Sequence, residues 1–525
     1  MSGPDVRQER LTQLLLTGVL LVASMLVGLA GQALIAYYFG AGTRSDSLFL
    51  ARDVSDLAGK LLLTAQAVGV LVPFVVVLRA REGLAASDRA LSAVLTTMAL
   101  IGTALAVLLV LCAGPLVDIL APGFSDAAAR QSVVLLRIVA PMTPFVAVAA
   151  LATAALQARH RFGRAMVPGI LGSAIVVAVT PVSVHLAGIE GAAAAMTIGV
   201  IGQAACGWAL LLVEGVPAVI APWRERRHVV EFARRTTPFL TYAAATVGSG
   251  ITLRIAASLL GTGLYAAYAL GYRLYRAVMT LLLVPVQQVL LPALSHSEAG
   301  GRREDSAAEL VATLRYLEFL LVPITVALAA LSEQVVSAVF ERGAFSAGSA
   351  ASTGRVLAFF SIAIVPTGVA LLLEQAAYAR RQTKLIVRVN LVAECVQGAL
   401  YIPFVLALGA SGIPIAVILA MSVSTSIYAR NLRPAPLRAH VDFIGRLAAC
   451  AAAMLAVVLA TASLIGAALS PGPGLAQAVE IVPACLTGTA AYVVGARLAG
   501  LREPRQLRAL LHAALLRGGG APLTG

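Results

Sequence analysis

The chain of 525 residues is 59% hydrophobic and only 12% charged, whereas a soluble domain is about 45–50% apolar and about 25% charged. This composition excludes a soluble globular protein and predicts that lipid surrounds most of the chain. The formal net charge is +14, but the charges lie in short segments between apolar runs, which is typical of membrane topology and argues against a nucleic-acid partner. The five cysteines are far apart in apolar runs, so we expect small buried side chains.

Apolar runs long enough to cross a bilayer recur along the whole chain. We predict an all-α integral membrane protein with about 14 transmembrane helices, because one crossing needs about 20 mostly apolar residues. The boundaries between closely spaced spans are the hardest to place, such as that between the fifth and sixth spans near "HLAGIEGAA". The predicted spans are residues 12–38, 47–78, 90–120, 131–157, 166–187, 191–213, 236–260, 264–293, 308–340, 352–378, 385–408, 412–429, 443–468 and 475–499.

Arginines alternate between the predicted loops. The loops that follow even-numbered spans hold most of them, as in 79–89, 224–235 and 380–384, and the others hold few, such as Arg44 and Arg130. Because positively charged loops stay in the cytoplasm, we expect an even number of spans and two cytoplasmic termini.

The longest basic connection, "EGVPAVIAPWRERRHVVEFARR", covers residues 214–235. It separates a predicted N-terminal lobe, 1–213, from a C-terminal lobe, 236–430, and residues 431–525 add two spans and a basic tail. The connection is interpreted as a cytoplasmic linker or as an amphipathic helix on anionic headgroups, and both descriptions can hold. The tail "LREPRQLRALLHAALLRGGG" has the same character.

Motifs for nucleotide or metal chemistry are missing from the sequence. There is no GxxxxGK[ST] and no HExxH, and the six histidines are scattered. We therefore expect no enzyme activity, no cofactor and no metal site. Any transport would take its energy from an ion gradient, the membrane potential or the substrate's own gradient.

The stretch "ARDVSDLAGK", residues 51–60, carries four charges between two apolar runs. Helical spacing places Arg52, Asp53, Asp56 and Lys60 on one side of the second span, where they can pair along it. Such a side implies a water-filled cavity or a polar interior. The alternative is that 51–56 marks the membrane surface before the span begins. The opposite side can face lipid and consists of Leu50, Val54, Leu57, Leu61 and Leu62.

The eighth span contains two arginines in "GYRLYRAV". Arg273 and Arg276 are three residues apart on one helix face, and two guanidinium groups there suit a phosphate-bearing ligand. The alternative is an internal ion pair with Glu374 or Glu394. Glu394, inside the eleventh span, is also a candidate proton or cation site, or a structural hydrogen-bond partner.

Five stretches, in order along the chain, are similar to the sequences of one family. They are "IAYYFGAGTRSDSLFLA" (35–51), "APGF" (121–124), "LQARHRFGRAMVPGIL" (156–171), "AYALGYRLYRAVMTLLLVPVQQVLLPALSHS" (267–297) and "VFERGAFSAGSAASTGRVLAFFSIAIVPTGVALLLEQAAYARRQTK" (339–384). Together they resemble the MurJ/MviN lipid II flippases. The resemblance implies a two-lobed, pseudo-symmetric bundle of the multidrug/oligosaccharidyl-lipid/polysaccharide exporter superfamily in the bacterial cytoplasmic membrane. It further implies a cationic central cavity and alternating access that carries a pyrophosphate-linked sugar while the polyprenyl tail stays in lipid.

The cavity arginines of that family are only partly present. The resemblance places the eighth-span arginine on Arg273, the two first-span arginines on Met25 and Gly31, and the second-span arginine on Gly59, beside Lys60. Losing two phosphate contacts of about 1.5–3 kcal/mol each weakens binding by about two to four decades. The family's proline and asparagine in the second span are replaced by Ser55 and Asp56.

Three functions fit these features. The first is a flippase for lipid II or a related lipid-linked sugar, whose headgroup binds Arg273 and Arg276, with Lys60, Arg52 and Arg254 as substitutes for the missing cations. The second is ion-coupled export of a small amphiphile or drug. The third is a non-transporting scaffold for cell-wall synthesis proteins. The expected partners are a lipid-linked oligosaccharide or other amphiphile and membrane lipids. The candidate ion or charge-pair residues are Asp53, Asp56, Glu394 and Glu374.

Overall fold

The computed structural model describes residues 4–503 apart from 63–65, 160, 218–221, 238–239, 300–302, 433–436, 470–471, 473 and 502. The described residues form helices joined by short connections, with no strand among them, which confirms the all-α prediction. The predicted tail helix lies outside the described residues. Two compact units are present: the first holds Met1–Ala277, Phe340–Ser352 and Asn390–Ala416, and the second holds Val278–Val339, Thr353–Val389 and Val417–Gly525.

Ten complete helices and most of the polar side chains discussed below belong to the first unit. Part of α11 (Leu264–Ala299) belongs to it as well. The ten are α1 (Pro4–Phe39), α2 (Thr43–Leu62), α3 (Gln66–Glu82), α4 (Leu84–Leu111), α5 (Ala113–Leu120), α6 (Asp126–Val139), α7 (Thr143–Ala158), α8 (Phe162–Val213), α9 (Arg226–Thr236) and α10 (Leu240–Ser258), with 3₁₀ turns at Ala140–Met142 and Pro222–Glu225.

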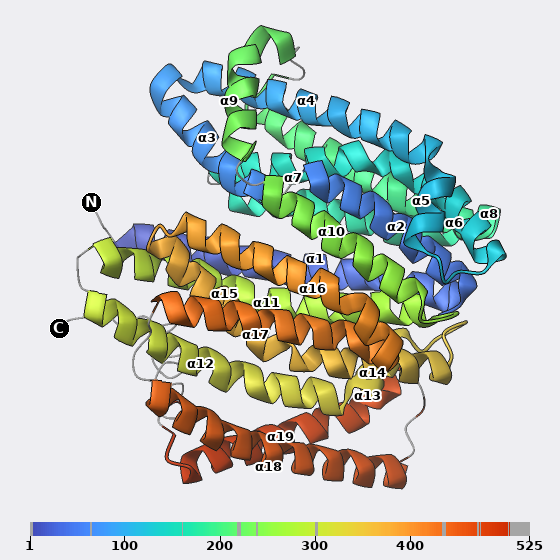
Figure 1. The fold of residues 1–525 in the computed structure, drawn as a ribbon, viewed down its shortest axis with the longest axis vertical. Coiled ribbons are helices and arrows are strands. Elements are labelled where there is room, and N and C mark those ends of the chain that lie inside the picture. Colours follow the sequence, from blue (N-terminus) through green and yellow to red (C-terminus); the bar gives the residue numbers. More distant parts are fainter. Residues whose placement is uncertain are drawn as a thin grey trace. The chain divides into compact units, whose positions relative to one another are not determined.

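The second unit contains the C-terminal helices, among which α18 and α19 lie side by side (Figure 1). Its helices are α12 (Arg303–Ala330), α13 (Ser332–Phe340), α15 (Ile364–Ala379), α18 (Leu437–Leu469) and α19 (Ala478–Leu498). Besides α11, three further helices are divided between the units along the chain: α14 (Ala347–Ile362), α16 (Thr383–Leu408) and α17 (Gly412–Leu432). The predicted lobe boundaries stay a prediction.

Eight helical segments among the described residues are long and apolar enough to cross a bilayer, and the bent pair of α14 and α15 makes nine. Two of the eight, Gly163–Val213 and Thr383–Leu432, are 51 and 50 residues long, more than twice the ~20 residues that one crossing needs. The first is broken at Ala187 and Gly188, whose backbone angles are not helical. Gly188 has φ +55°, a conformation that costs glycine little. The break lies inside "HLAGIEGAA", in agreement with the predicted boundary; the total of 14 spans stays a prediction.

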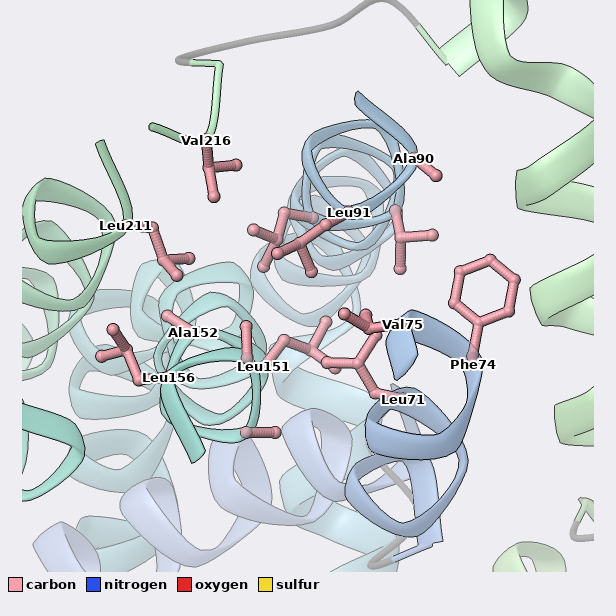
Figure 2. Packing of buried hydrophobic residues seen from close by; sticks show 14 of the residues in the cluster. Leu71, Phe74, Val75, Ala90, Leu91, Leu151, Ala152, Leu156, Leu211 and Val216 are labelled. Atoms are coloured by element: carbon pink, nitrogen blue, oxygen red, sulfur yellow. The ribbon is translucent and has the colours of Figure 1, made fainter. Parts of the chain in front are cut away.

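Figure 2 shows the apolar core that joins α3, α4, α7 and the end of α8. Leu71, Leu91 and Leu151 from three of these helices are fully buried in it. Side chains of this size gain about 1.5–3 kcal/mol each from burial relative to water. In lipid this gain is smaller, because the surroundings are already apolar, and close packing holds the helices together instead.

The basic helix α9 packs against this core through aromatic and polar contacts. The rings of Phe232 and Phe74 are 5.6 Å apart in an edge-on arrangement. The buried imidazole of His228 lies between two carboxylates, with Nδ1 2.8 Å from Glu225 and Nε2 3.0 Å from Glu82. Burial alone would raise the pKa of Glu225, but hydrogen bonds from His228 and Arg89 lower it below its ordinary value.

The carboxylate of Asp46, on α2, caps the N-terminal end of α11. The backbone N–H groups of Gly263 and Ala266 donate to Asp46 over 2.6 and 2.7 Å. These groups are among the first N–H donors of a helix, which have no partner within the helix itself. Asp46 is therefore an N-cap supplied by a helix about 220 residues earlier in the chain, and it fixes where α11 starts relative to α2.

Replacing Asp46 by alanine is expected to lower the free energy of unfolding by about 1.5–3 kcal/mol, because two hydrogen bonds to a buried carboxylate are lost. Thermal unfolding of the purified protein in detergent measures the loss. Asp118→Ala removes an exposed acid of α5 and should leave the midpoint unchanged; equal effects of both changes would contradict the capping role.

Replacing Glu225 by glutamine is expected to loosen α9. The carboxylate stabilises the docked helix above its unfolded pKa of about 4.3, and this stabilisation is lost as pH falls through the lowered folded value. At neutral pH, amide exchange in Arg226–Thr236 should rise about fivefold in Glu225→Gln, which corresponds to about 1 kcal/mol.

The matched control for this measurement is Glu231→Gln. Glu231 accepts a hydrogen bond of 2.5 Å from Arg235 within α9 itself, so its loss should leave the docking intact. Equal exchange rates in the two variants would show that Glu225 does not hold the helix in place.

Candidate functional site

A polar cavity of about 270 Å³ lies within the first unit, between α2, α10, α11 and α16. Five charged residues line it: Asp53, Asp56, Arg254, Arg273 and Glu394. They come from four helices, and the sequence analysis singled out each of them. The cavity approaches the lower end of the range typical of small-ligand sites, about 300–1,000 Å³, so a phosphate group fits it better than a whole lipid does.

The charged side of α2 has the predicted pairing in part. Arg52 and Asp56 are four residues apart, and their side chains approach to 3.7 Å. The carboxylate of Asp53 pairs with Arg273 of α11 instead. The side chain of Lys60 lies outside the described residues. The hydrophobic side does not face lipid as predicted: Leu50, Val54 and Leu57 are buried within the protein.

Arg273 is held from three directions. Its guanidinium donates to Gln32 of α1 over 2.9 Å and forms an ion pair of 3.5 Å with Asp53. It also lies 4.4 Å above the ring of Phe49, a cation–π geometry. The ion-pair partner of Arg273 is thus Asp53, whereas the sequence analysis considered Glu374 and Glu394.

Arg254 ties α10 to α2. Its two terminal nitrogens donate to the backbone carbonyls of Gly250, over 2.6 Å, and Asp53, over 2.7 Å. The residue is 8% exposed, and its Nε has no hydrogen-bond partner among the described residues. A buried donor of this kind is costly unless a ligand or water satisfies it.

Glu394 lies on α16, at the opposite wall of the cavity. Its carboxylate accepts hydrogen bonds from the hydroxyls of Ser249 and Thr246, both on α10. These contacts confirm the alternative that Glu394 is a structural hydrogen-bond partner. Its role as a proton or cation site stays a prediction. About two turns further along α16, Tyr401 donates to Gln397 over 2.7 Å.

A row of tyrosines on α11 forms part of the site. The hydroxyl of Tyr265 donates to Asp53 over 3.2 Å, and the rings of Tyr268 and Tyr272 stack 5.9 Å apart. The sequence analysis quoted stretches that contain Tyr268 and Tyr272 but assigned no role to any of the three. Their spacing of three and four residues, in "LYAAYALGY", is the helical signal that could have found them.

A second cavity, of about 130 Å³, adjoins the charged side of α2. Arg52 and Asp56 line it together with glycines of α1 and α8, and Gly31 is one of them. Gly31 is the position on which the family resemblance places a cavity arginine. The structure therefore has empty space where a long cationic side chain is expected from the resemblance.

The remaining predicted residues lie apart from the polar cavity. Arg276 is exposed and does not line it. Glu374 belongs to the second unit. Among the described residues, no group of histidine, cysteine, aspartate or glutamate side chains has a metal-binding arrangement. The chemistry available in the cavity is charge pairing and hydrogen bonding.

Comparison with known proteins identifies one family. Residues 35–477 match the family model described as lipid II flippase MurJ. Among curated proteins, the chain is 26% identical over 416 residues to the probable lipid II flippase MurJ of Rhizobium tropici, covering 75% of each chain. It is 27% identical to the corresponding Thermotoga maritima protein, covering 75% of this chain and 79% of that one.

Solved structures give the same fold. Lipid II flippase MurJ in an inward closed conformation matches with TM-score 0.75 and 19% identity, over 92% of this chain and 98% of that chain. An inward-facing multidrug resistance transporter of the MATE family matches with TM-score 0.67 and 14% identity, over 79% and 97%. This likeness confirms the predicted fold class of a MurJ- and MATE-like helical bundle.

Replacing Arg254 by methionine is expected to destabilise the first unit by about 1.5–3 kcal/mol, because a buried charged donor that links two helices is lost. Thermal unfolding in detergent measures this effect. Arg137→Met changes an exposed arginine of α6 and serves as the control. An unfolding midpoint of Arg254→Met equal to that of the control would show that the link to Asp53 contributes nothing.

Proposed function

The chain belongs to the lipid II flippase MurJ family, and we propose on that basis that it moves a polyprenyl-diphosphate-linked cell-wall precursor across the cytoplasmic membrane. The cargo is lipid II or a related lipid-linked sugar, and the transport cycle is alternating access. The family match over residues 35–477 supports the proposal, as does the fold.

The observation that carries the proposal is the position of Arg273. It is a guanidinium in a polar cavity of a multi-pass membrane protein, held by Gln32, Asp53 and Phe49. A charge at bilayer depth is costly and marks a functional site. The planar guanidinium binds two phosphate oxygens at once, and Arg273 is the position on which the family resemblance places a cavity arginine.

The other proposed cations differ in how they lie relative to Arg273 and the polar cavity. Arg52 and Arg254 lie close to Arg273, on α2 and α10, and we assign them to the same headgroup site. The proposed set also includes Arg276, which is exposed and does not line the polar cavity, and Lys60, whose side chain lies outside the described residues. Each arginine of the cavity has partners within the protein, so we expect phosphate binding to be weaker than in a cavity without acids.

The proposal includes an orientation. We expect both termini to be cytoplasmic because the arginine-rich loops favour that side, in the bacterial inner membrane. The protein acts by binding and conformational change, without bond-making catalysis. Its partners are the lipid-linked sugar, membrane lipids and proteins of cell-wall synthesis.

One observation favours a second candidate function, ion-coupled export of a small amphiphile. The polar cavity is lined by three acids and two arginines, a balance that also suits a cation. Asp53, Asp56 and Glu394 would carry the ion, and Glu374 of the second unit is the further candidate. Drug efflux that depends on a proton or sodium gradient in proteoliposomes would favour this function over the first.

Replacing Arg273 by alanine is expected to abolish rescue of a bacterial strain depleted of its own lipid II flippase, because about 1.5–3 kcal/mol of charge-assisted phosphate binding is lost. Colony formation after depletion measures the rescue, with membrane levels checked by immunoblot. Arg137→Ala removes an exposed cation and should rescue fully. Full rescue by both variants would contradict the role of Arg273.

A further inference from the structure

One side of α9 is docked on the first unit. Phe232 and His228 are four residues apart on one helix face, and both are buried. Their partners on α3 are the ring of Phe74 and the carboxylate of Glu82. Glu225, directly before the helix, belongs to the same contact through its hydrogen bond with His228. The docked side therefore holds aromatic and acidic groups, and α9 lies beside α3 in the fold (Figure 1).

The opposite side of α9 is basic. An α-helix turns by about 100° per residue, so Val230 and Arg234, two residues before and after Phe232, point away from the docked side. Arg226 and Arg227 lie four and three residues before Val230 and share its face. All four are exposed, and the side chain of Arg227 is 81% exposed. These four residues form the basic face of α9, in which three positive charges surround one valine.

An exposed indole lies next to the basic face. Trp223 is part of the 3₁₀ turn Pro222–Glu225 that leads into α9, and it is 75% exposed. Arg224, its neighbour, is exposed as well. Tryptophan is enriched where membrane and water meet, because its ring is apolar and its N–H is polar. A tryptophan beside a row of arginines is typical of a helix that lies among lipid headgroups.

The helix α9 is tied to the ends of two other helices. At its start, Glu225 pairs with Arg89 over 2.9 Å, and Arg89 lies near the beginning of the membrane-capable segment Leu84–Leu111. At its end, Thr236 is followed four residues later by Leu240, the first residue of α10, which belongs to a predicted span. Lipid headgroups are therefore within reach of the basic face.

We propose that the basic face of α9, together with Trp223, binds anionic phospholipids of the cytoplasmic leaflet. The arginines pair with the headgroup phosphates, and the indole ring of Trp223 lies at the boundary between headgroups and acyl chains. Charge complementarity supports this partner, because the cytoplasmic leaflet carries a negative surface potential that attracts basic segments. The apolar ring supports a lipid over an acidic protein, because the acyl boundary accepts it. The inference concerns the surface of the first unit and does not depend on the cargo.

The chain contains its own fluorescent probe. It has two tryptophans, and the other one, Trp208, packs against the apolar core that α3, α4, α7 and α8 form. The Trp208→Phe variant therefore leaves Trp223 as its single indole. The full chain is placed in phosphatidylcholine nanodiscs that contain the same minor fraction of either brominated phosphatidylglycerol, which is anionic, or brominated phosphatidylcholine, which is zwitterionic. Bromine quenches an indole at short range, so the quenching reports which lipid lies beside Trp223.

We expect phosphatidylglycerol to be enriched beside Trp223 by at least about fivefold over phosphatidylcholine, which is the contribution of one arginine near an anionic surface. The double variant Arg226→Gln/Arg234→Gln removes two charges of the basic face and leaves the docked side unchanged. It should lower the enrichment by more than about half, since Arg224 and Arg227 remain.

The matched control is Arg130→Gln/Arg137→Gln, which removes two exposed arginines of α6 and changes the net charge equally. It should keep the full enrichment. Equal quenching by the two lipids, or equal enrichment in the two double variants, would overturn the inference. An unquenched Trp223 would overturn it as well, and this is the result expected if an acidic protein is the partner.

A second measurement keeps the test valid if Trp208→Phe does not fold. The difference in fluorescence between the unmodified protein and Trp223→Phe isolates the signal of Trp223 without any change at Trp208, and the same two lipids are compared. A difference signal that the two lipids quench equally would again contradict the inference. The site around Arg273 takes no part in these measurements, so the inference and the proposed function fail separately.

Discussion

Asp53 is the residue on which the polar cavity depends, because it acts through two separate groups. Its carbonyl oxygen accepts from Arg254 of α10, and its carboxylate accepts from Tyr265 and pairs with Arg273 of α11. Buried charges persist in a protein only when they are paired and hydrogen-bonded. The carboxylate that pairs with Arg273 inside the first unit therefore also limits what Arg273 can offer a ligand.

The sequence was sufficient for features that depend on local spacing or on composition. The Arg52–Asp56 pair follows from a separation of four residues, and the break at Ala187–Gly188 falls where the apolar pattern is interrupted. Contacts between residues far apart in the sequence could not be predicted. Gln32 and Arg273 are 241 residues apart, and nothing in either segment indicates that they meet.

The buried leucines of α2 illustrate a different limit. Leu50 and Leu57 were expected to face lipid, and they lie inside the protein. In a soluble protein an apolar side identifies the core, but in a membrane both the core and the lipid accept apolar side chains. The hydrophobic pattern therefore distinguishes water-facing from apolar surfaces, but it does not tell whether an apolar surface faces the protein interior or the lipid.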